Sequence, residues 1–177
     1  MFSGNSRVQN AMVELKAKLD DLATVRDKLI QYSAEQVGTF HQIDIYYEIP
    51  KGRLKLREVE GKIDAELIYY ERENVAEPKR SSVFILTIPQ PQIFKQILER
   101  IMKVKAVVDK IREIYFFEGI QVHLDTVRGL GFFIEFELIT SQDLEQQKKD
   151  LIKLEKLKER LDIGSESLER LSYGDLI

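Results

Sequence analysis

The 177-residue sequence contains no cysteine and only two histidines, His41 and His123. Without thiols the chain can form neither disulfides nor thiolate zinc sites, and two histidines are too few for a typical histidine-rich metal centre. We therefore expect any bound metal ion to be held by carboxylates.

Long apolar runs and an excess of positive charge are also missing. No segment approaches the roughly 20 apolar residues that span a bilayer, and the first ten residues lack the apolar core of a signal peptide. The formal net charge of -3 gives no general attraction to nucleic acid or to an anionic membrane. The sequence therefore predicts a soluble, cytoplasmic protein without nucleic-acid or membrane partners. A homodimer is left open.

The chain has only four prolines, and 44% of its residues are hydrophobic, which is typical of a single globular domain. We expect one domain over residues 1–177, with 1–11 flexible. Alternating and β-branched segments predict about eight strands, at 12–19, 40–50, 52–61, 65–73, 81–89, 107–117, 120–127 and 131–139.

Apolar residues at helical spacing predict three helices, at 20–34, 90–105 and 140–164. The first follows an Asp cap and the second has Pro91 near its start. Thr140 stands three residues before Asp143, the spacing of a capping box, and predicts the start of the third. Residues 165–177 have enough apolar positions to dock as a short last helix.

Charged residues recur at every second position of these strands. The segment 52–57 places only cations on one face, Arg53, Lys55 and Arg57, whereas Glu135 and Glu137 make the last strand anionic. An open sheet or sandwich with one solvated side would also alternate, and it remains the structural alternative. Because the helices are few, we favour an α+β fold: a closed or nearly closed antiparallel eight-stranded barrel with charged residues inside and helices packed outside.

Inward-facing charges need counterions. Buried like charges are costly, so clustered Lys and Arg imply an anionic ligand and clustered carboxylates imply a divalent cation. The inward set has six cations against four carboxylates, a surplus of two: Lys16, Lys55, Arg57, Arg72, Lys110 and Arg112 against Glu14, Asp125, Glu135 and Glu137. A nucleoside triphosphate with one magnesium ion carries about two negative charges, which would neutralise this surplus.

Several segments resemble, in order, those of the CYTH proteins, the triphosphate tunnel metalloenzymes that include class IV adenylate cyclases and thiamine triphosphatases. They are VELKAKLDDL, HQIDIYY, GRLKLRE, YYERE, VDKIREIY, VHLDTVRGLGFFIEFE and the closing LSYGDLI. The most specific is HLDTVRGLGFFIEFE, which combines an Asp, a Gly-Leu-Gly turn and paired glutamates in one hairpin.

The resemblance implies a barrel whose lumen binds a triphosphate: ATP, thiamine triphosphate or inorganic triphosphate. By matching positions it implies triphosphate contacts at Lys16, Lys55, Arg57, Arg72, Lys110 and Arg112. It likewise implies Mg²⁺ or Mn²⁺ ligands at Glu14, Asp125, Glu135 and Glu137, whereas no residue is assigned a catalytic role. The residue types agree, because hard carboxylate oxygens suit these ions and Arg forks match phosphate oxygens.

One position departs from the family. Its N-terminal signature is ExExK, and this chain has Met12 at the first Glu position, which puts two-metal catalysis and activity in question. We favour a metal-dependent adenylate cyclase-like reaction, with triphosphate hydrolysis as the alternative and a non-catalytic triphosphate- or polyphosphate-binding module as another.

Other polar residues receive structural interpretations. His123 is interpreted as structural rather than as a proton carrier and Asp44 as a hydrogen-bond acceptor. Arg53 is expected to reach either solvent or phosphate.

Because unpaired inward cations repel, we expect Arg57→Ala to abolish binding yet leave the ligand-free fold equally or more stable.

Overall fold

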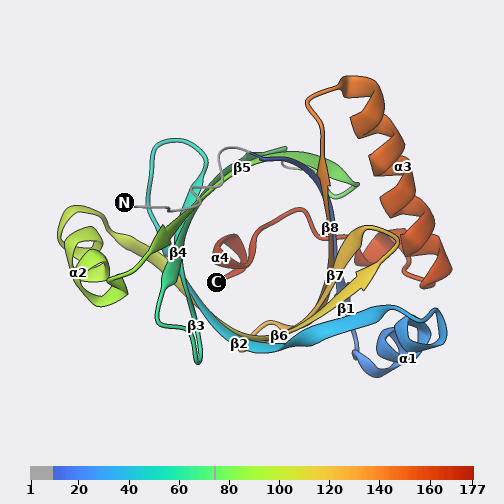
Figure 1. Cartoon of the computed structure of the whole chain (residues 1–177), viewed down its shortest axis with the longest axis horizontal. Coiled ribbons are helices and arrows are strands. Elements are labelled where there is room, and N and C mark those ends of the chain that lie inside the picture. The colour runs from blue at the N-terminus through green and yellow to red at the C-terminus, as the bar shows by residue number, and fades with distance from the viewer. Residues whose placement is uncertain (1–9, 74) are drawn as a thin grey trace, which may run out of the picture.

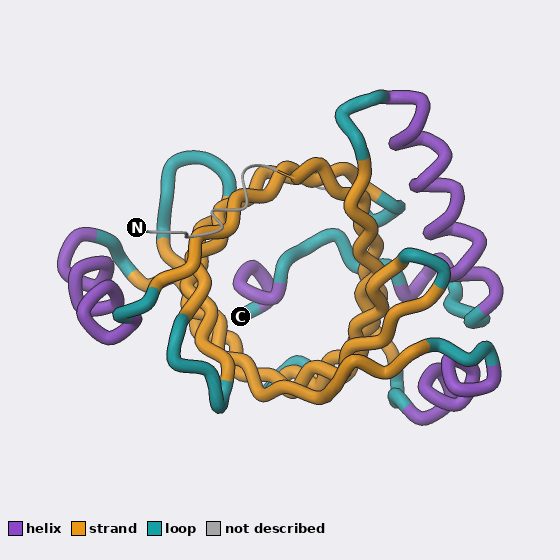
Figure 2. The backbone as a smooth tube through the Cα atoms, in the orientation of Figure 1, coloured by secondary structure: helices purple, strands orange, loops and turns teal. Residues whose placement is uncertain are grey.

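The computed structural model describes residues 10–73 and 75–177. Within them, eight antiparallel strands close into a barrel in the order β1-β5-β4-β3-β2-β6-β7-β8, seen end-on as a ring in Figure 1 and Figure 2. The strands are β1 (Asn10–Leu19), β2 (Glu35–Tyr47), β3 (Arg53–Val59), β4 (Ala65–Arg72), β5 (Lys79–Ile88), β6 (Val104–Phe117), β7 (Ile120–Val127) and β8 (Gly131–Thr140). The predicted α+β class and closed antiparallel barrel are confirmed.

Of the segment 1–11 that we expected to be flexible, residues 1–9 lie outside the described residues, and Asn10 and Ala11 begin β1. That residues 1–177 form one domain stays a prediction. β2 begins at Glu35 rather than at residue 40, because it pairs with β6 as far as Phe116. A register shift between Gln36 and Gly38 interrupts the alternation there, so the sequence period hides this part of the strand.

Three helices pack on the outside of the barrel, as predicted (Figure 1). They are α1 (Ala23–Gln31), α2 (Pro91–Ile101) and α3 (Leu144–Arg160). No helix of the described part of the chain is long and apolar enough to cross a membrane.

The start of α3 differs from the prediction. Thr140 is the last residue of β8, paired with Ala11, and its hydroxyl donates to Asp150 at 2.6 Å. Asp143 caps the helix by accepting from the backbone N–H of Gln146 at 3.0 Å. The capping box predicted at Thr140 and Asp143 is therefore wrong, because strand pairing keeps Thr140 in the sheet.

The apolar faces of the strands point outward. The largest cluster of buried apolar side chains joins the outer faces of β1, β7 and β8 to α1 and α3, with Leu15, Leu29 and Leu154 fully buried. A second cluster places Leu98 of α2 against Ile45 and Leu56. Helices cover part of this apolar outer surface, and the charged residues on the opposite faces of the same strands line the lumen.

The last helix, α4 (Tyr173–Leu176), lies within the ring of strands instead of outside it (Figure 1). The Tyr173 ring meets Phe133 edge-on, with 5.0 Å between centroids. A Cβ at Gly174 would lie 2.6 Å from the ring of Tyr46, so only glycine permits this approach. Asp175, half of a capping box with Ser172, accepts from Arg53 Nε at 2.9 Å. The C-terminus is thereby anchored inside the barrel.

Candidate functional site

A cavity of about 110 Å³ lies in the lumen. Nine of the ten predicted site residues line it: Glu14, Lys16, Lys55, Arg57, Arg72, Lys110, Arg112, Glu135 and Glu137. The tenth, Asp125, is fully buried and bonded to Arg112. Ligand pockets usually measure roughly 300–1,000 Å³. Side chains therefore fill most of the lumen in this state, and a ligand the size of a triphosphate would have to displace some of their mutual contacts.

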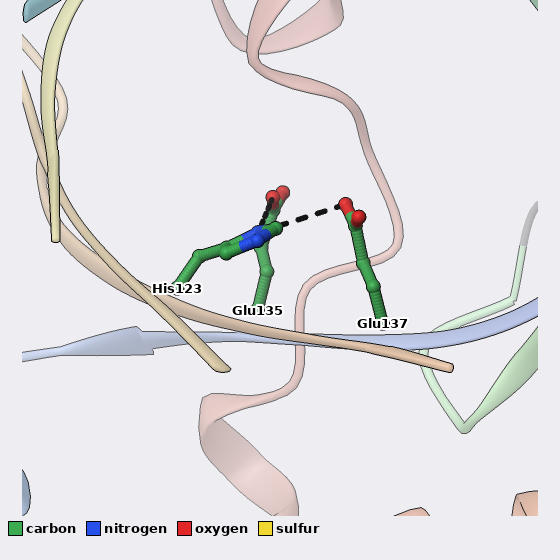
Figure 3. Close-up of side chains that lie close together, drawn as sticks. All are labelled: His123, Glu135 and Glu137. Atoms are coloured by element: carbon green, nitrogen blue, oxygen red, sulfur yellow. Dashed lines mark ion pairs between the residues drawn. The ribbon is translucent and has the colours of Figure 1, made fainter. Parts of the chain in front are cut away.

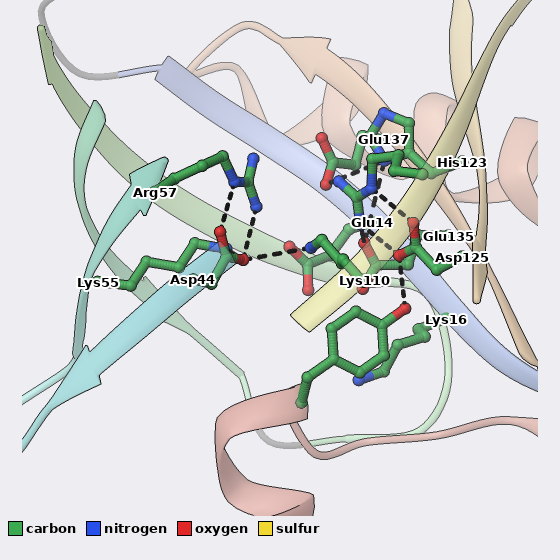
Figure 4. Close-up of polar contacts among 12 residues, drawn as sticks. Glu14, Lys16, Asp44, Lys55, Arg57, Lys110, His123, Asp125, Glu135 and Glu137 are labelled. Carbon is green, nitrogen blue, oxygen red and sulfur yellow. Dashed lines mark hydrogen bonds and ion pairs between the residues drawn. The ribbon is translucent and has the colours of Figure 1, made fainter. Parts of the chain in front are cut away.

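Asp44 is the centre of the cationic side of the lumen (Figure 4). Its buried carboxylate accepts from Arg57 Nε at 2.7 Å, Lys55 Nζ at 2.9 Å and Lys110 Nζ at 3.2 Å. Burial alone would raise the pKa of Asp44, but Arg57, Lys110 and Lys55 hold it well below the usual range. Asp44 thus serves as the internal counterion of three predicted phosphate-binding residues, a larger role than the sequence indicated.

Lysines in the lumen have lowered pKa values, so they lose their protons more readily than exposed lysines do. Burial, with Arg57 nearby, lowers the pKa of Lys55 to about 7 although Asp44 opposes this. Burial also lowers the pKa of Lys16 and of Lys79 to about 8. An anion entering the lumen would restore their full charge, so anion binding and proton uptake are coupled here.

Arg112 organises the opposite, carboxylate-rich side. Its guanidinium donates to both oxygens of Asp125, at 2.7 and 2.5 Å, and to Glu135 at 2.5 Å. Tyr173 donates its hydroxyl to Asp125 at 2.7 Å, so α4 contributes to the same network. Burial would raise the pKa of Asp125 and of Glu135, but Arg112 holds both below their usual values. Asp125 therefore has both oxygens engaged, unlike the other predicted metal ligands.

Three carboxylates crowd together beside this network. Glu14 and Glu137 are direct cross-strand partners on β1 and β8, and Glu135 follows on the same face. Burial, Glu137 and Glu135 raise the pKa of Glu14 even though Arg72 bonds to it. Crowded, half-buried carboxylates offer the hard oxygen ligands that a divalent cation prefers, so Glu14, Glu135 and Glu137 fit Mg²⁺ or Mn²⁺.

The C-terminal segment bonds to two predicted phosphate contacts, Lys16 and Arg72, and to one further cation, Lys79. Backbone carbonyls accept from Lys16 at Leu171 and from Arg72 at Arg170, the latter at 3.1 Å. Lys79 Nζ donates to the carbonyls of Val75 and Glu169, at 2.8 and 3.3 Å. In this state, uncharged carbonyl oxygens satisfy cations that could instead bind anionic oxygens.

Sequence reasoning missed some lumen residues. Lys79 is fully buried and stands two residues before Ser81, on the same face of β5, but the predicted strand began only at residue 81. Arg53 binds Asp175, neither of the two outcomes considered for it. Adding Lys79 and Asp44 to the predicted set gives seven cations and five carboxylates. The surplus of two positive charges is unchanged.

Comparisons with known proteins agree with this barrel. The sequence pattern of the CYTH domain matches residues 10–173. A protein of Methanocaldococcus jannaschii, named as a candidate adenylate cyclase, is 28% identical over 173 residues, which cover 93% of this chain and 97% of that protein.

Solved structures give the same fold. A protein of Pyrococcus horikoshii OT3 superposes with a TM-score of 0.82 at 24% identity, covering 94% of this chain and 99% of that one. A Hippeastrum protein, described as a candidate adenylyl cyclase with a dominant triphosphatase activity, superposes with a TM-score of 0.61 at 17% identity, covering 86% and 88%.

Proposed function

Because the chain belongs to the CYTH family, whose members process triphosphates, we propose that it binds a triphosphate in its lumen and transforms it with the help of Mg²⁺ or Mn²⁺. The favoured reaction is adenylate cyclase-like, converting ATP to cyclic AMP and pyrophosphate. The observation that carries the proposal is the gathering of nine predicted site residues around one cavity in the lumen.

The cations would bind the phosphates. Arg57 and Arg112 present guanidinium forks, which can donate paired hydrogen bonds to phosphate oxygens once their carboxylate partners give way. Lys16, Lys55, Arg72 and Lys110 would supply further charge. A triphosphate would thus take over bonds now made by Asp44 and by the C-terminal carbonyls.

The carboxylates would hold the metal ion. Glu14, Asp125, Glu135 and Glu137 are the proposed ligands, with Asp125 needing release from Arg112. A bound divalent ion would stabilise negative charge that develops on the reacting phosphate. The protein's own part is to orient the triphosphate between its cationic and carboxylate sides.

Hydrolysis of thiamine triphosphate or inorganic triphosphate is the second candidate. The activity given for the Hippeastrum relative favours it, and water as attacking group needs no positioned ribose hydroxyl. A non-catalytic binding module is the third candidate. It is motivated by Met12, which lines the cavity where the family has a carboxylate.

Product analysis separates the three candidates. The protein is incubated with Mg²⁺ or Mn²⁺ and with ATP, thiamine triphosphate or tripolyphosphate, and products are resolved by chromatography. We expect cyclic AMP and pyrophosphate from ATP; orthophosphate with a diphosphate would establish a triphosphatase instead. Glu137→Gln should abolish either activity, whereas Glu48→Gln, in an exposed ion pair with Lys103, should retain it. Binding without any product would leave only the module.

The affinity for tripolyphosphate should fall as pH rises from about 7 to 9. A bound anion favours charged Lys55, whose pKa is about 7 in the free protein, so binding takes up protons and weakens once Lys55 is neutral. Isothermal titration calorimetry measures the affinity at each pH. Lys55→Arg, always charged, should show a flatter dependence, and because the ligand's own titration is common to both proteins, identical slopes would contradict the prediction.

A further inference from the structure

His123 projects from β7 into the lumen, where only long ion-pair contacts, to Glu135 and Glu137, are recorded for it among the described residues. It stands directly opposite Glu135 on β8, and its side chain is buried. Its Nδ1 atom has no hydrogen-bond partner among the described residues. A buried, unsatisfied ring nitrogen is costly, so its environment is incomplete as it stands.

The atoms facing Nδ1 are carboxylate oxygens. Glu137 Oε1 lies 3.7 Å away and Glu135 Oε2 lies 3.9 Å away, and Figure 3 shows the three side chains converging. Both distances exceed that of a hydrogen bond. They are shorter than the roughly 4.2 Å that can separate two ligand atoms sharing one ion at about 2.1 Å from each.

We propose that His123, Glu135 and Glu137 form a mixed nitrogen and oxygen site that selects Mn²⁺ and other first-row transition ions over Mg²⁺. One ligand atom from each of the three residues lies within 4.8 Å of the others. Imidazole is a good ligand for transition metals, whereas Mg²⁺ prefers oxygen and water. Glu135 Oε2, the oxygen that faces Nδ1, also accepts from Arg112, so binding an ion there would share or replace that hydrogen bond.

Met12 supports this selectivity. It lines the same cavity as Glu135 and Glu137 and packs against Ile68, Tyr70 and Val83, so this position supplies no carboxylate. A site with one carboxylate fewer and one imidazole more is softer, which disfavours Mg²⁺. The proposal rests on the proposed function for its setting but concerns metal binding by the protein alone.

Pulsed electron paramagnetic resonance of bound Mn²⁺ tests the proposal without substrate, because it detects a nitrogen coordinated to the ion. We expect a ¹⁴N coupling in the wild type that is lost in His123→Gln. Affinity for Mn²⁺ should fall about tenfold or more, since even groups that only orient a ligand contribute 10- to 100-fold. Affinity for Mg²⁺ should change much less.

His41→Gln is the matched control, because His41 is the other histidine and bonds Asp109 and Glu60 on the outside of the barrel. It should keep the coupling. Wild-type protein labelled with ¹⁵N-histidine should exchange the ¹⁴N signal for a ¹⁵N signal, which removes any dependence on the folding of a variant. Mn²⁺ bound without nitrogen coupling, a coupling lost only in His41→Gln, equal wild-type affinities for the two ions, or no binding at all would overturn the proposal. Because triphosphate is absent, its outcome is independent of the activity assay.

Discussion

Asp44→Asn is expected to destabilise the ligand-free protein by roughly 3–5 kcal/mol, the usual loss when one partner of a buried ion pair is removed. Asparagine keeps the size of the side chain but removes the charge that neutralises Lys55, Arg57 and Lys110. All three cations remain in the lumen, 11% exposed or less for the two lysine side chains and 14% for Arg57. Chemical denaturation measures the free energy of unfolding.

Tripolyphosphate should reverse much of this loss. With Asp44 neutral, the lumen lacks one negative charge, and an anionic ligand would replace the missing counterion. The ligand should therefore raise the melting temperature of Asp44→Asn more than that of the wild type. The exposed pair of Glu48 and Lys103 provides the control, and Glu48→Gln should change stability by about 1 kcal/mol or less. A stable Asp44→Asn protein that gains no more from the anion would show that the cations are not held by Asp44.

The alternation of the sequence, together with the small number of helices, led to the prediction of a barrel with a charged lumen. Successive side chains of a strand point to opposite faces, so neighbouring Leu15 and Lys16 must lie on different faces of the sheet. The face on which the helices pack is then the outer, apolar one. Lys110, Arg112, Glu135 and Glu137 could therefore be assigned to one lumen without knowing how the strands pair. The same reasoning failed where the period is broken, at the start of β2, and where β5 extends to Lys79.

Partner choice within the lumen could not be predicted, because it depends on register between strands far apart in sequence. Asp44 reaches Lys110 only because β2 pairs with β6, and His123 faces Glu135 through the pairing of β7 with β8. The expectation that Arg57→Ala would not destabilise the fold assumed an unpaired cation. Arg57 in fact donates two hydrogen bonds to Asp44, so the assumption does not hold.

The position of α4 was equally out of reach. Four residues are too few to show a helical period, and the helix is held by distant partners such as Arg53 and Phe133. Nothing in the local sequence distinguishes a tail that docks outside the barrel from one that enters it. The close approach of Gly174 to Tyr46 becomes meaningful only once both are placed.

Arg112→Met is expected to destabilise the ligand-free protein by roughly 3–5 kcal/mol. Here the cation of a buried ion pair is removed, whereas Asp44→Asn removes the anion. Methionine fills similar space, but among the described residues Asp125 then keeps only the hydrogen bond from the Tyr173 hydroxyl, and Glu135 loses its 2.5 Å bond to Arg112. Denaturation experiments compare this variant with Arg128→Met, whose exposed guanidinium lies 3.5 Å from Asp109 and should contribute about 1 kcal/mol or less.

A divalent cation should rescue Arg112→Met, just as an anion rescues Asp44→Asn. Asp125 and Glu135, freed from the guanidinium, become better metal ligands, so Mn²⁺ should raise the melting temperature of the variant more than that of the wild type. If Arg112→Met were as stable as Arg128→Met and indifferent to Mn²⁺, repulsion among lumen cations would outweigh their internal pairing. If both variants respond to the ion of the missing sign, the ligand-free lumen holds its charges in pairs that a triphosphate and a metal ion can replace.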